Sequence, residues 1–502
     1  MDEHDDASIG TGIPGLDQGL DGGLTPNRIY LVEGNPGAGK TTLALQYLLE
    51  GVRCGETVLY MTLSESAVGL ESGARSHGWS LEGVTVREYV MHEAAFGHEP
   101  ITMFHPAEVE LGETLRRMLA DVDELRPTRV VLDALSELRL LAETPIRYRR
   151  QLLAFKQFFL KRRCTVLLLD DCSAVPGDPH VQSVLHGVVM LEVYRSRYGG
   201  DSRQLRVSKL RGRSFRSGAH DYEIRRGGLE VFPRLVASEH GVSYERAPLP
   251  SGIPELDALL GGGPVAGTSL LLLGPAGTGK TTIAMQYAAS ACRRGEHAAI
   301  FSFDETLGTL TGRLREVGID VAPLVESGRM RLQQVDPVEL SPGELGHLVR
   351  GAVERDGAKL VVIDSLNGYI NAMHAEQYVT AQLHELLAYL ANRGVVTLLL
   401  VGQHGLVGTV HEAPVDASYL SDSLLLLRYF EAEGRVRKAI AVTKKRGGGH
   451  ENTLRELVID RHGIRVGEPL SDFRGVLTGV PEYVGRPEDL VKAGRVRRGG
   501  SV

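Results

Sequence analysis

The sequence contains 502 residues, more than one ordinary hydrophobic core accommodates, so two or three domains are expected. Hydrophobic residues at 42%, charged residues at 24% and a net charge of −7 are typical of a globular protein and give no electrostatic reason for the whole surface to bind nucleic acid or membrane. No apolar run reaches the roughly 18 residues of a membrane helix, the first residues are acidic where a signal peptide would be basic, and the four cysteines form no C-x-x-C pair. We therefore expect a cytoplasmic protein without a membrane segment, disulfide scaffold or cysteine-based zinc site.

The chain repeats itself with a domain-sized period. Two pairs of segments recur at the same offset of 240 positions: Thr11–Asp17 with Ser251–Asp257, and Gly34–Thr42 with Gly274–Thr282. Later matches keep their order while the offset drifts by a few residues, as loop insertions would produce. This pattern predicts a tandem duplication, with one domain at residues 1–240, a second at 241–485 and a basic tail at 486–502. The tail is interpreted either as a solvated, disordered end or as a peptide that docks a partner.

Short apolar runs alternate with amphipathic stretches in each copy. The expected strands are Ile29–Glu33, Thr57–Thr62, Val130–Asp133 and Thr165–Asp170 in the first copy, and Ser269–Leu273, Ala298–Phe303, Leu360–Asp364 and Val395–Val401 in the second. Helical patterns occupy Thr41–Arg53, Tyr148–Arg162 and Ala375–Asn392. The alternation predicts an α/β fold in which each domain is a mostly parallel, twisted sheet flanked by helices, extended by hairpin strands from the later part of each copy.

Both copies contain a glycine-rich loop with the pattern G-x-x-x-x-G-K-[ST] between an expected strand and an expected helix. Backbone N–H groups of such a loop surround phosphates, and the following helix N-terminus adds a favourable partial charge. The candidate nucleotide-binding residues are Gly34, Gly37, Gly39, Lys40, Thr41 and Thr42 in the first copy, and Gly274, Gly277, Gly279, Lys280, Thr281 and Thr282 in the second. ATP is the expected cofactor, with both lysines reaching its β- and γ-phosphates.

Magnesium ligands are expected beside each loop. Thr41 and Thr281 would place a hydroxyl on Mg²⁺. Asp133 and Asp364 each end a hydrophobic run and are candidates for the aspartate that holds the ion through that hydroxyl and water. An aspartate at a strand end is ordinarily a helix cap or turn residue, but the upstream phosphate loop favours the metal role.

Hydrolysis also requires a group that orients or deprotonates the attacking water. After the next strand, the second copy has Asp304 and Glu305, whereas the first copy has Ser64 and Glu65. The three acids are candidates for the catalytic base, although a surface turn would produce the same pattern. Because a serine hydroxyl cannot act as the base, the first domain is expected to hydrolyse slowly or to rely on Glu65. The difference suggests that copy one clamps nucleotide and that copy two is the active one.

These motifs resemble the KaiC family of double-domain, RecA-fold ATPases over residues 8–485. The most specific patches are Leu420–Leu427 (LSDSLLLL) followed by Lys444–Gly447 (KKRG), with Ser136–Arg139 (SELR) and Tyr148–Arg150 (YRR) indicating the non-clock branch. The resemblance implies tandem RecA-like domains in hexameric double rings with ATP between subunits. It also implies a signalling protein partner, and neither membrane nor nucleic acid as a partner.

Two Lys-x-Arg pairs would, under that resemblance, reach the γ-phosphate held by a neighbouring subunit, as arginine fingers do. The pairs are Lys209 with Arg211, and Lys444 with Arg446. Without the family context, K-x-R on a strand indicates a solvated edge. A site shared in this way predicts heterologous contacts that close into a ring.

The second domain of family members also transfers phosphate to adjacent serine and threonine residues of its own. The matching positions here are Ser418 and Tyr419, so Ser418 is the phosphoacceptor candidate. The tyrosine in place of threonine counts against a two-site autokinase cycle, and modification at the single serine stays open.

Three functions of different classes remain. The first is an oligomeric, Mg²⁺-dependent ATPase that acts as a signalling switch, with or without serine autophosphorylation. The second is a RecA-like, DNA-dependent motor, against which stand the negative charge and the lack of a zinc module or an aromatic and basic stripe. The third is a nucleotide-dependent scaffold without hydrolysis, which Ser64 favours and the acids at Asp304 and Glu305 oppose.

Overall fold

The computed structural model describes residues 8–89, 106–142, 144–171, 179–195, 200–336, 338–371, 376–403, 417–432, 434–477 and 481–485. The chain divides into two compact units, Met1–Arg234 and Leu235–Val502, so the two copies of the sequence repeat fall in separate units. The expected basic tail at 486–502 lies outside the described residues.

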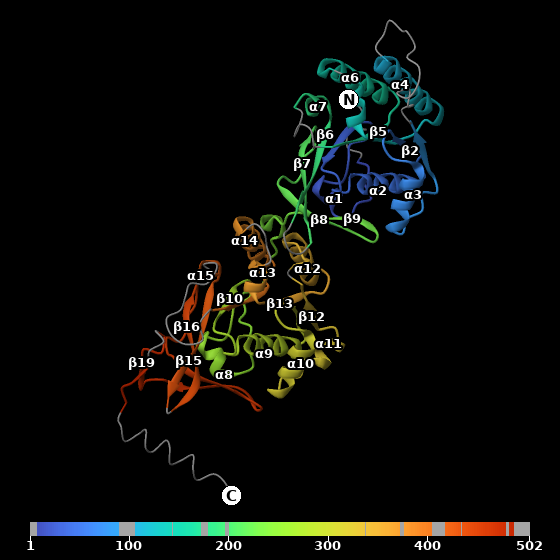
Figure 1. The fold of residues 1–502 in the computed structure, drawn as a ribbon. Helices are drawn as coiled ribbons and strands as arrows, with labels where there is room; N and C mark the ends of the chain where they lie inside the picture. The colour runs from blue at the N-terminus through green and yellow to red at the C-terminus, as the bar shows by residue number, and fades with distance from the viewer. Residues whose placement is uncertain are drawn as a thin grey trace. The chain divides into compact units, whose positions relative to one another are not determined.

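The N-terminal unit is built on one nine-stranded sheet with the order β3-β2-β4-β5-β1-β6-β7-β8-β9 (Figure 1). Its strands are β1 Ile29–Gly34, β2 Val58–Thr62, β3 Val84–Glu88, β4 Arg129–Asp133, β5 Thr165–Asp171, β6 Gly187–Tyr194, β7 Ser202–Leu210, β8 Ala219–Arg225 and β9 Gly228–Phe232. Its helices are α1 Leu16–Gly19, α2 Lys40–Arg53, α3 Ala67–Ser76, α4 Pro106–Leu125, α5 Leu135–Leu141, α6 Pro145–Lys161 and α7 Pro179–Val184. In this order, neighbouring strands from β3 through β2, β4, β5 and β1 to β6 pair in parallel. The neighbours from β6 through β7 and β8 to β9 pair antiparallel.

The C-terminal unit repeats this sheet with the order β12-β11-β13-β14-β10-β15-β16-β17-β18 and adds the pair β19-β20. Its strands are β10 Ser269–Gly274, β11 His297–Ser302, β12 Met330–Gln334, β13 Ala358–Asp364, β14 Val396–Gly402, β15 Ser423–Ala432, β16 Arg435–Lys445, β17 Arg455–Asp460, β18 Gly463–Pro469, β19 Phe473–Arg474 and β20 Glu482–Tyr483. Its helices are η2 Ala237–His240, α8 Pro254–Leu259, α9 Lys280–Arg293, α10 Leu307–Glu316, α11 Ala322–Glu326, α12 Pro342–Glu354, α13 Leu366–Asn371, α14 Glu376–Asn392 and α15 Ala417–Leu420. The predicted fold of tandem RecA-like domains is confirmed.

Strand β1 shows why each sheet carries helices on both faces. Tyr30 and Val32 pack in one hydrophobic cluster with residues of α2, while Ile29 and Leu31 pack in a second cluster with residues of α4 and α6. Successive strand side chains point to opposite faces, so a strand that is covered on both faces is apolar throughout. The sheet of the C-terminal unit has the same two clusters.

The edges of the sheets and the ends of the helices differ most from the sequence expectations. Strands β3 and β12, each at a sheet edge, were not predicted, because half-buried edge strands lack the continuous apolar run of the central ones. Helix α6 begins at Pro145, earlier than the predicted start at Tyr148, because the Thr144 hydroxyl accepts the Arg147 N–H and proline suits the first helical position.

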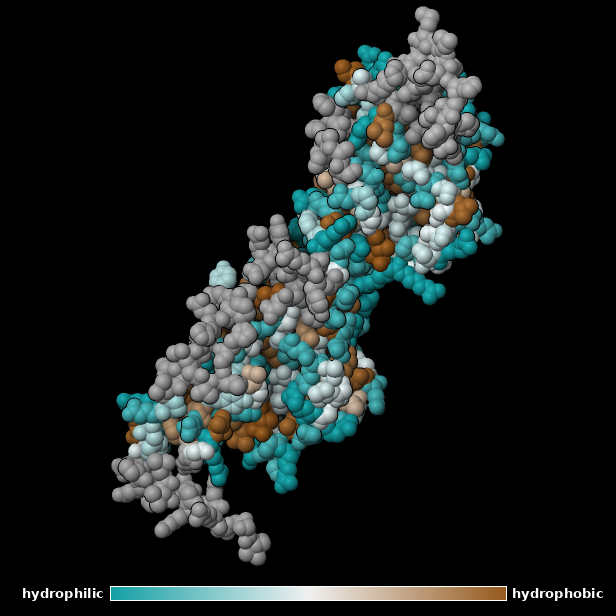
Figure 2. Space-filling view, in the orientation of Figure 1, coloured by the Kyte–Doolittle hydropathy of each residue, from teal (hydrophilic) through white to brown (hydrophobic). Residues whose placement is uncertain are grey.

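Hydrophilic side chains cover most of the described surface in the view of Figure 2, with hydrophobic ones scattered among them. Large exposed hydrophobic residues such as Val68, Ile146 and Val436 come from different elements, which is ordinary for a globular surface. Within the described ranges, no helix combines the length and the apolar composition needed to cross a membrane.

Arg129 at the start of β4 is a buried charge on which the N-terminal unit depends. Its side chain forms a two-pronged ion pair with Glu56, with Nε to Oε2 and Nη2 to Oε1 both at 2.9 Å. Its Nη1 donates to the carbonyl oxygens of Gly10 and Tyr47 at 2.8 and 3.0 Å. Replacing Arg129 by methionine is expected to lower the free energy of unfolding by about 3 kcal/mol, because Glu56 loses its ion pair and keeps only the Thr128 hydroxyl, and both carbonyl groups lose the guanidinium. Urea denaturation followed by circular dichroism measures the loss.

The exposed ion pair of Arg53 with Glu50 provides a matched control, and Arg53→Met should leave the denaturation midpoint nearly unchanged. The Arg129 hydrogen bonds also lower the pKa of Glu56. The stabilising contribution of this pair is therefore present above the ordinary glutamate pKa and is lost as pH falls through the lowered value. A midpoint that Arg129→Met leaves in place would contradict the structural role.

Candidate functional site

Each glycine-rich loop lies between a central strand and a helix, β1 and α2 in one unit and β10 and α9 in the other. Gly39 and Gly279, at the two helix N-caps, adopt φ values of 91° and 109°. A Cβ on Gly39 would lie 2.4 Å from Ile224 Cδ1, and one on Gly279 would lie 2.2 Å from Ile459 Cδ1, so only glycine fits at either place. The helix N-termini behind them leave N–H groups without intrahelical partners, which suits them to bind phosphate.

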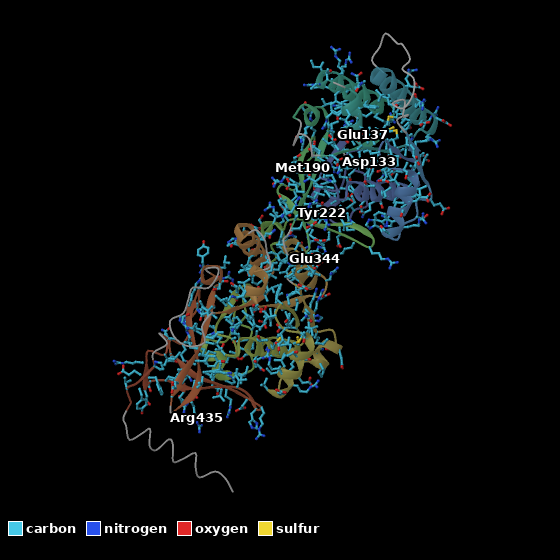
Figure 3. The ribbon with its side chains drawn as sticks, in the orientation of Figure 1. Asp133, Glu137, Met190, Tyr222, Glu344 and Arg435 are labelled. Carbon is cyan, nitrogen blue, oxygen red and sulfur yellow. The ribbon has the colours of Figure 1, made fainter. Side chains whose placement is uncertain are left out.

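A tyrosine from the same sheet holds each loop. Tyr222 on β8 donates its hydroxyl to the Ala38 carbonyl oxygen at 2.7 Å, and Tyr429 on β15 donates to that of Ala276 at 3.2 Å. Figure 3 marks Tyr222 in the N-terminal unit. The sequence motif did not identify either tyrosine, because they come from strands far along the chain and from different strands in the two units.

The two phosphate-loop lysines have different partners. Lys280 Nζ donates to the carbonyl oxygens of Gly274 and Pro275, each at 2.8 Å. Lys40 makes the matching two contacts and a third, an ion pair with Asp171 Oδ1 at 2.6 Å. Asp171 ends β5 and belongs to none of the motifs in the sequence.

The expected magnesium residues meet in the C-terminal unit. Thr281 Oγ1 donates to Asp364 Oδ2 at 2.7 Å, and burial raises the pKa of Asp364. A hydroxyl beside a carboxylate suits Mg²⁺, which usually binds through one or two carboxylates together with substrate phosphates. In the part of the chain that the structure describes, no group of three or more His, Cys, Asp or Glu side chains could hold a metal by itself. The residues present therefore fit an ion that binds together with the nucleotide.

In the N-terminal unit, a tyrosine hydroxyl contacts the corresponding aspartate. Tyr60 on β2 is fully buried, and its hydroxyl donates to Asp133 Oδ2 at 2.6 Å. Ile300 occupies the matching position of the C-terminal unit. Burial raises the pKa of Asp133, as it does for Asp364. The aspartate of the first copy is thus engaged by a phenol, whereas that of the second is engaged by the loop threonine.

The two acids after β11 have different surroundings. Asp304 accepts a hydrogen bond from the Ser365 hydroxyl, at the turn after β13. Glu305 is bound by Arg313 through Nη2 at 2.8 Å and Nε at 3.2 Å, and Arg313 also donates to Thr282 Oγ1 at 3.3 Å. Because Glu305 is paired with a cation, Asp304 is the better placed of the two to accept a proton from water.

The N-terminal unit has other residues at the positions of Asp304, Ser365 and Arg313. Three positions differ together: Ser64 stands for Asp304, Ala134 for Ser365, and Gly73 for Arg313. Glu65 keeps an exposed carboxylate, while its backbone N–H and C=O bind the Thr62 hydroxyl at 2.9 and 2.8 Å. The N-terminal unit has no counterpart of Ser365 or Arg313 at these positions. An alignment of the two copies by the ends of their strands would have been needed to find this difference in the sequence.

Comparison with known proteins places this site in a family. A family model described as the KaiC ATPase matches residues 9–236 and again residues 249–471. The chain belongs to the KaiC family of ATPases. The resemblance drawn from the motifs is therefore confirmed.

Relatives with similar sequences cover nearly the whole chain. The circadian clock protein KaiC3 of Synechocystis sp. is 26% identical over 487 residues, 95% of each chain. KaiC2 of the same organism is 26% identical over 479 residues, 93% of this chain and 83% of its own length. The circadian clock oscillator protein KaiC of Thermostichus vulcanus is 26% identical over 506 residues, 98% of this chain and 95% of its own. The two tandem domains of this chain thus match the KaiC family over their full extent.

The Lys-x-Arg pairs of this KaiC-family chain lie away from the phosphate loops of their own units. Lys444 on β16 pairs with Leu424 of β15, which pairs with Leu271 of β10, whereas the phosphate loop follows Gly274 at the other end of β10. Leu271 and Gly274 are three residues apart on β10, so the position of Lys444 and the start of the phosphate loop are about 10 Å apart along the strand direction. Lys209 on β7 lies at the corresponding level of its sheet. Neither unit brings its Lys-x-Arg pair to its own loop.

Carbonyl oxygens hold these pairs near their strand ends. Lys209 donates to Gln182 and Ser183, and Arg211 donates to Ser183 at 2.8 Å. In the C-terminal unit, the Lys444 ammonium donates to the Ser421 carbonyl oxygen at 2.6 Å. Ser418 lies in α15, and its side chain is outside the described part of the structure. The trans contacts and the phosphoacceptor stay predictions.

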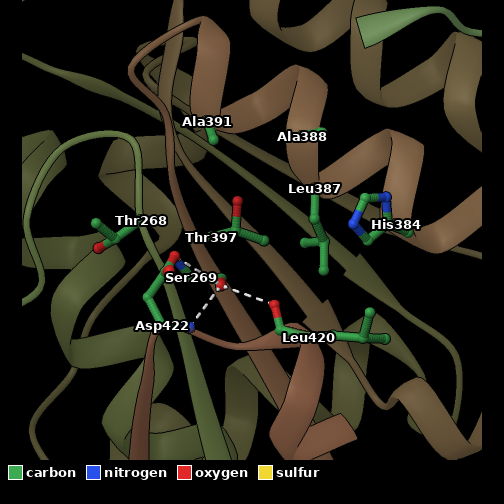
Figure 4. Close-up of a pocket in the computed structure, with 9 residues that line it drawn as sticks. All are labelled: Thr268, Ser269, His384, Leu387, Ala388, Ala391, Thr397, Leu420 and Asp422. Atoms are coloured by element: carbon green, nitrogen blue, oxygen red, sulfur yellow. Dashed lines mark hydrogen bonds between the residues drawn. The ribbon is translucent and has the colours of Figure 1, made fainter. Parts of the chain in front are cut away.

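Asp422 links Arg446 of the C-terminal Lys-x-Arg pair to the central strand β10. Its Oδ2 accepts the N–H and the hydroxyl of Ser269 at 3.0 and 3.2 Å, and its Oδ1 lies 3.9 Å from the Arg446 guanidinium, which is 56% exposed. Asp422, Ser269, His384 and Leu387 are among the residues that line a cavity of about 150 Å³ (Figure 4). Because the cavity lies at the start of β10, it is separate from the phosphate loop at the end of that strand.

Proposed function

We propose that the C-terminal unit binds and hydrolyses Mg²⁺–ATP and that the chain works as a ring-forming regulatory ATPase. The observation that carries the proposal is a set of three features at the carboxyl ends of β10, β13 and β11: the lysine Lys280, the pair Thr281–Asp364 and the pair Asp304–Ser365. Ligands of open α/β sheets bind at this edge. The arrangement supports phosphate binding, metal binding and water activation together.

Thr281, Asp364 and Lys280 are the side chains that would bind the metal and the phosphates. Thr281 and Asp364 would hold Mg²⁺, which when bound offsets the negative charge of the phosphates. Lys280 uses two of its three N–H donors on its own loop, so the third is available for a phosphate oxygen. Burial lowers the pKa of Lys280, against the opposing charges of Asp364 and Asp304, and an added phosphate would favour its charged form.

Water activation falls to Asp304. The Ser365 hydroxyl binds one oxygen of this carboxylate and orients it. The other oxygen, Oδ1, would lie 2.9 Å from a Cβ placed on Gly368, so the missing side chain there leaves room beside it. We assign to Oδ1 the proton of the water that attacks the γ-phosphate.

The two separated parts of the site support assembly into a homo-oligomeric ring, which the family resemblance implies is a hexamer. A Lys-x-Arg pair distant from its own loop can serve the loop of a neighbouring subunit, and such head-to-tail contacts form a ring when their rotation closes. The description of the relatives as circadian clock proteins supports a regulatory output through a protein partner in place of work on DNA.

Incubation with γ-labelled ATP and Mg²⁺ tests the proposal, with label in free phosphate and in protein followed separately. We expect Lys280→Ala to remove most of the label in free phosphate and Lys40→Ala to remove less than half. The reason is that Asp304, the carboxylate that we assign as the base, belongs to the C-terminal unit. Protein-bound label that Ser418→Ala abolishes would add serine autophosphorylation to the proposed activity.

Two results would contradict the ATPase switch. Rings that form with ATP yet release no phosphate would indicate a nucleotide-dependent scaffold. Phosphate release that requires DNA, with DNA binding that weakens steeply as salt rises, would indicate a RecA-like motor.

A further inference from the structure

All three donors of the lysine in the N-terminal loop are already engaged. A lysine ammonium has three N–H donors. Lys40 Nζ donates to the carbonyl oxygens of Gly34 and Asn35 at 2.7 and 3.2 Å, and to Asp171 Oδ1 at 2.6 Å. The side chain of Lys40 is only 11% exposed, and that of Asp171 is 33% exposed. The ammonium charge that would attract a phosphate is thus neutralised by the protein itself.

Among the described residues, the C-terminal unit has no carboxylate at the place that corresponds to Asp171. The register of β1 with β5 sets Asp171 opposite Gly34, and the register of β10 with β14 sets Gly402 opposite Gly274. Within the described ranges, Lys280 donates to two loop carbonyl groups and to no carboxylate. The acidic side chain therefore distinguishes one loop from an otherwise matching one.

A neighbouring ion pair holds Asp171 beside the loop. The Asp171 N–H donates to Asp170 Oδ1 at 3.0 Å. Asp170 is buried, with its side chain 2% exposed, and is paired with Arg139, whose guanidinium lies over the Tyr148 ring. The end of β5 is thus anchored, and the Asp171 carboxylate stays where a phosphate would meet Lys40.

We propose that Asp171 is a specificity-determining residue of the N-terminal nucleotide site, where it competes with phosphate for Lys40 and disfavours a nucleoside triphosphate more than a diphosphate. The inference rests on the proposed function, because it requires nucleotide at both loops. A bound nucleotide must displace the ion pair and then lies beside the Asp171 charge. That repulsion grows with the charge of the phosphate chain, so the triphosphate loses more affinity. The C-terminal unit accordingly takes up ATP first, while the N-terminal unit retains the diphosphate better.

Calorimetric titration of the full chain with ADP and with a slowly hydrolysed ATP analogue tests the inference. Lys280→Ala in all proteins of this series restricts binding to the N-terminal site. Adding Asp171→Asn removes the negative charge at nearly constant shape. We expect the affinity for the ATP analogue to rise about tenfold and that for ADP to rise about threefold or less.

The reverse substitution is available in the C-terminal unit. Among the described residues, a Cβ on Gly402 would meet only Asn367 Oδ1, at 3.8 Å, so the backbone there can carry a side chain. In a Lys40→Ala background, Gly402→Asp should lower the affinity of the C-terminal site for the ATP analogue about tenfold. The thermal unfolding midpoint, measured without nucleotide, checks that every variant of both series is folded.

The outcomes separate this inference from the proposed function. Unchanged or weaker binding of the ATP analogue by the Asp171→Asn protein would overturn the inference, and so would an equal gain for ADP and the analogue. Normal binding by the Lys40→Ala protein would leave the proposed C-terminal site intact in that case. Failure of the Lys40→Ala protein to bind either nucleotide would overturn the proposed function and the inference with it.

Discussion

Asp304→Asn is expected to lower kcat for ATP hydrolysis by about 100- to 10,000-fold, the range typical of a lost general base. Asparagine keeps the size of the side chain and can still accept the Ser365 hydrogen bond, but it cannot take a proton from water. Because ATP binding depends on other side chains, KM should change little. Steady-state phosphate release measures both constants.

Two neighbouring substitutions serve as controls for Asp304→Asn. Ser365→Ala should lower kcat about tenfold, because it removes the orientation of the carboxylate but keeps the base. Combined with Asp304→Asn it should have little further effect, since the serine acts through that aspartate. Glu305→Gln should act mainly on stability through the lost Arg313 pair. A kcat that falls with Glu305→Gln and persists with Asp304→Asn would reassign the base.

Arg446→Ala is expected to lower kcat by about 1,000-fold, the usual lower range for an arginine that stabilises phosphoryl transfer. Arg446 is more than half exposed and lies away from the phosphate loop of its own unit, so its effect should arise at the site of a neighbouring subunit. Arg435→Ala, at the opposite end of β16 and also exposed, is the matched control and should leave kcat unchanged.

A mixing experiment distinguishes a trans role of Arg446 from a structural one. Arg446→Ala subunits retain Lys280, and Lys280→Ala subunits retain Arg446, so a ring that contains both has some complete sites. Mixing the two inactive proteins should therefore restore a measurable fraction of phosphate release. Mixed rings that are detected by native mass spectrometry but stay inactive would contradict action in trans.

Much of the site was predictable from the sequence because it is local. A phosphate loop needs glycines, a lysine and a hydroxyl within nine residues, so the run from Gly274 to Thr282 identified strand, turn and helix at once. The apolar runs before Asp133 and Asp364 similarly located strands that the structure contains. Repetition of these patterns in one order was sufficient to indicate the KaiC family and its tandem fold.

Contacts between distant segments depended on the tertiary structure. Asp171 meets Lys40 across 131 positions, and Ser365 meets Asp304 across 61, because the strands that carry them end at one edge of a sheet. Tyr60, in the middle of β2, reaches Asp133 because β2 and β4 are paired neighbours in the sheet. Asp171, Ser365 and Tyr60 belong to no motif, so their types alone indicated no role.

The sequence by itself therefore determined the family, the two phosphate loops and the loss of an acid at Ser64. The structure alone decided which charge neutralises Lys40 and which hydroxyl orients Asp304. The physical reason is that composition and periodicity report what a segment forms locally, whereas strand order and register decide which side chains come within hydrogen-bonding distance.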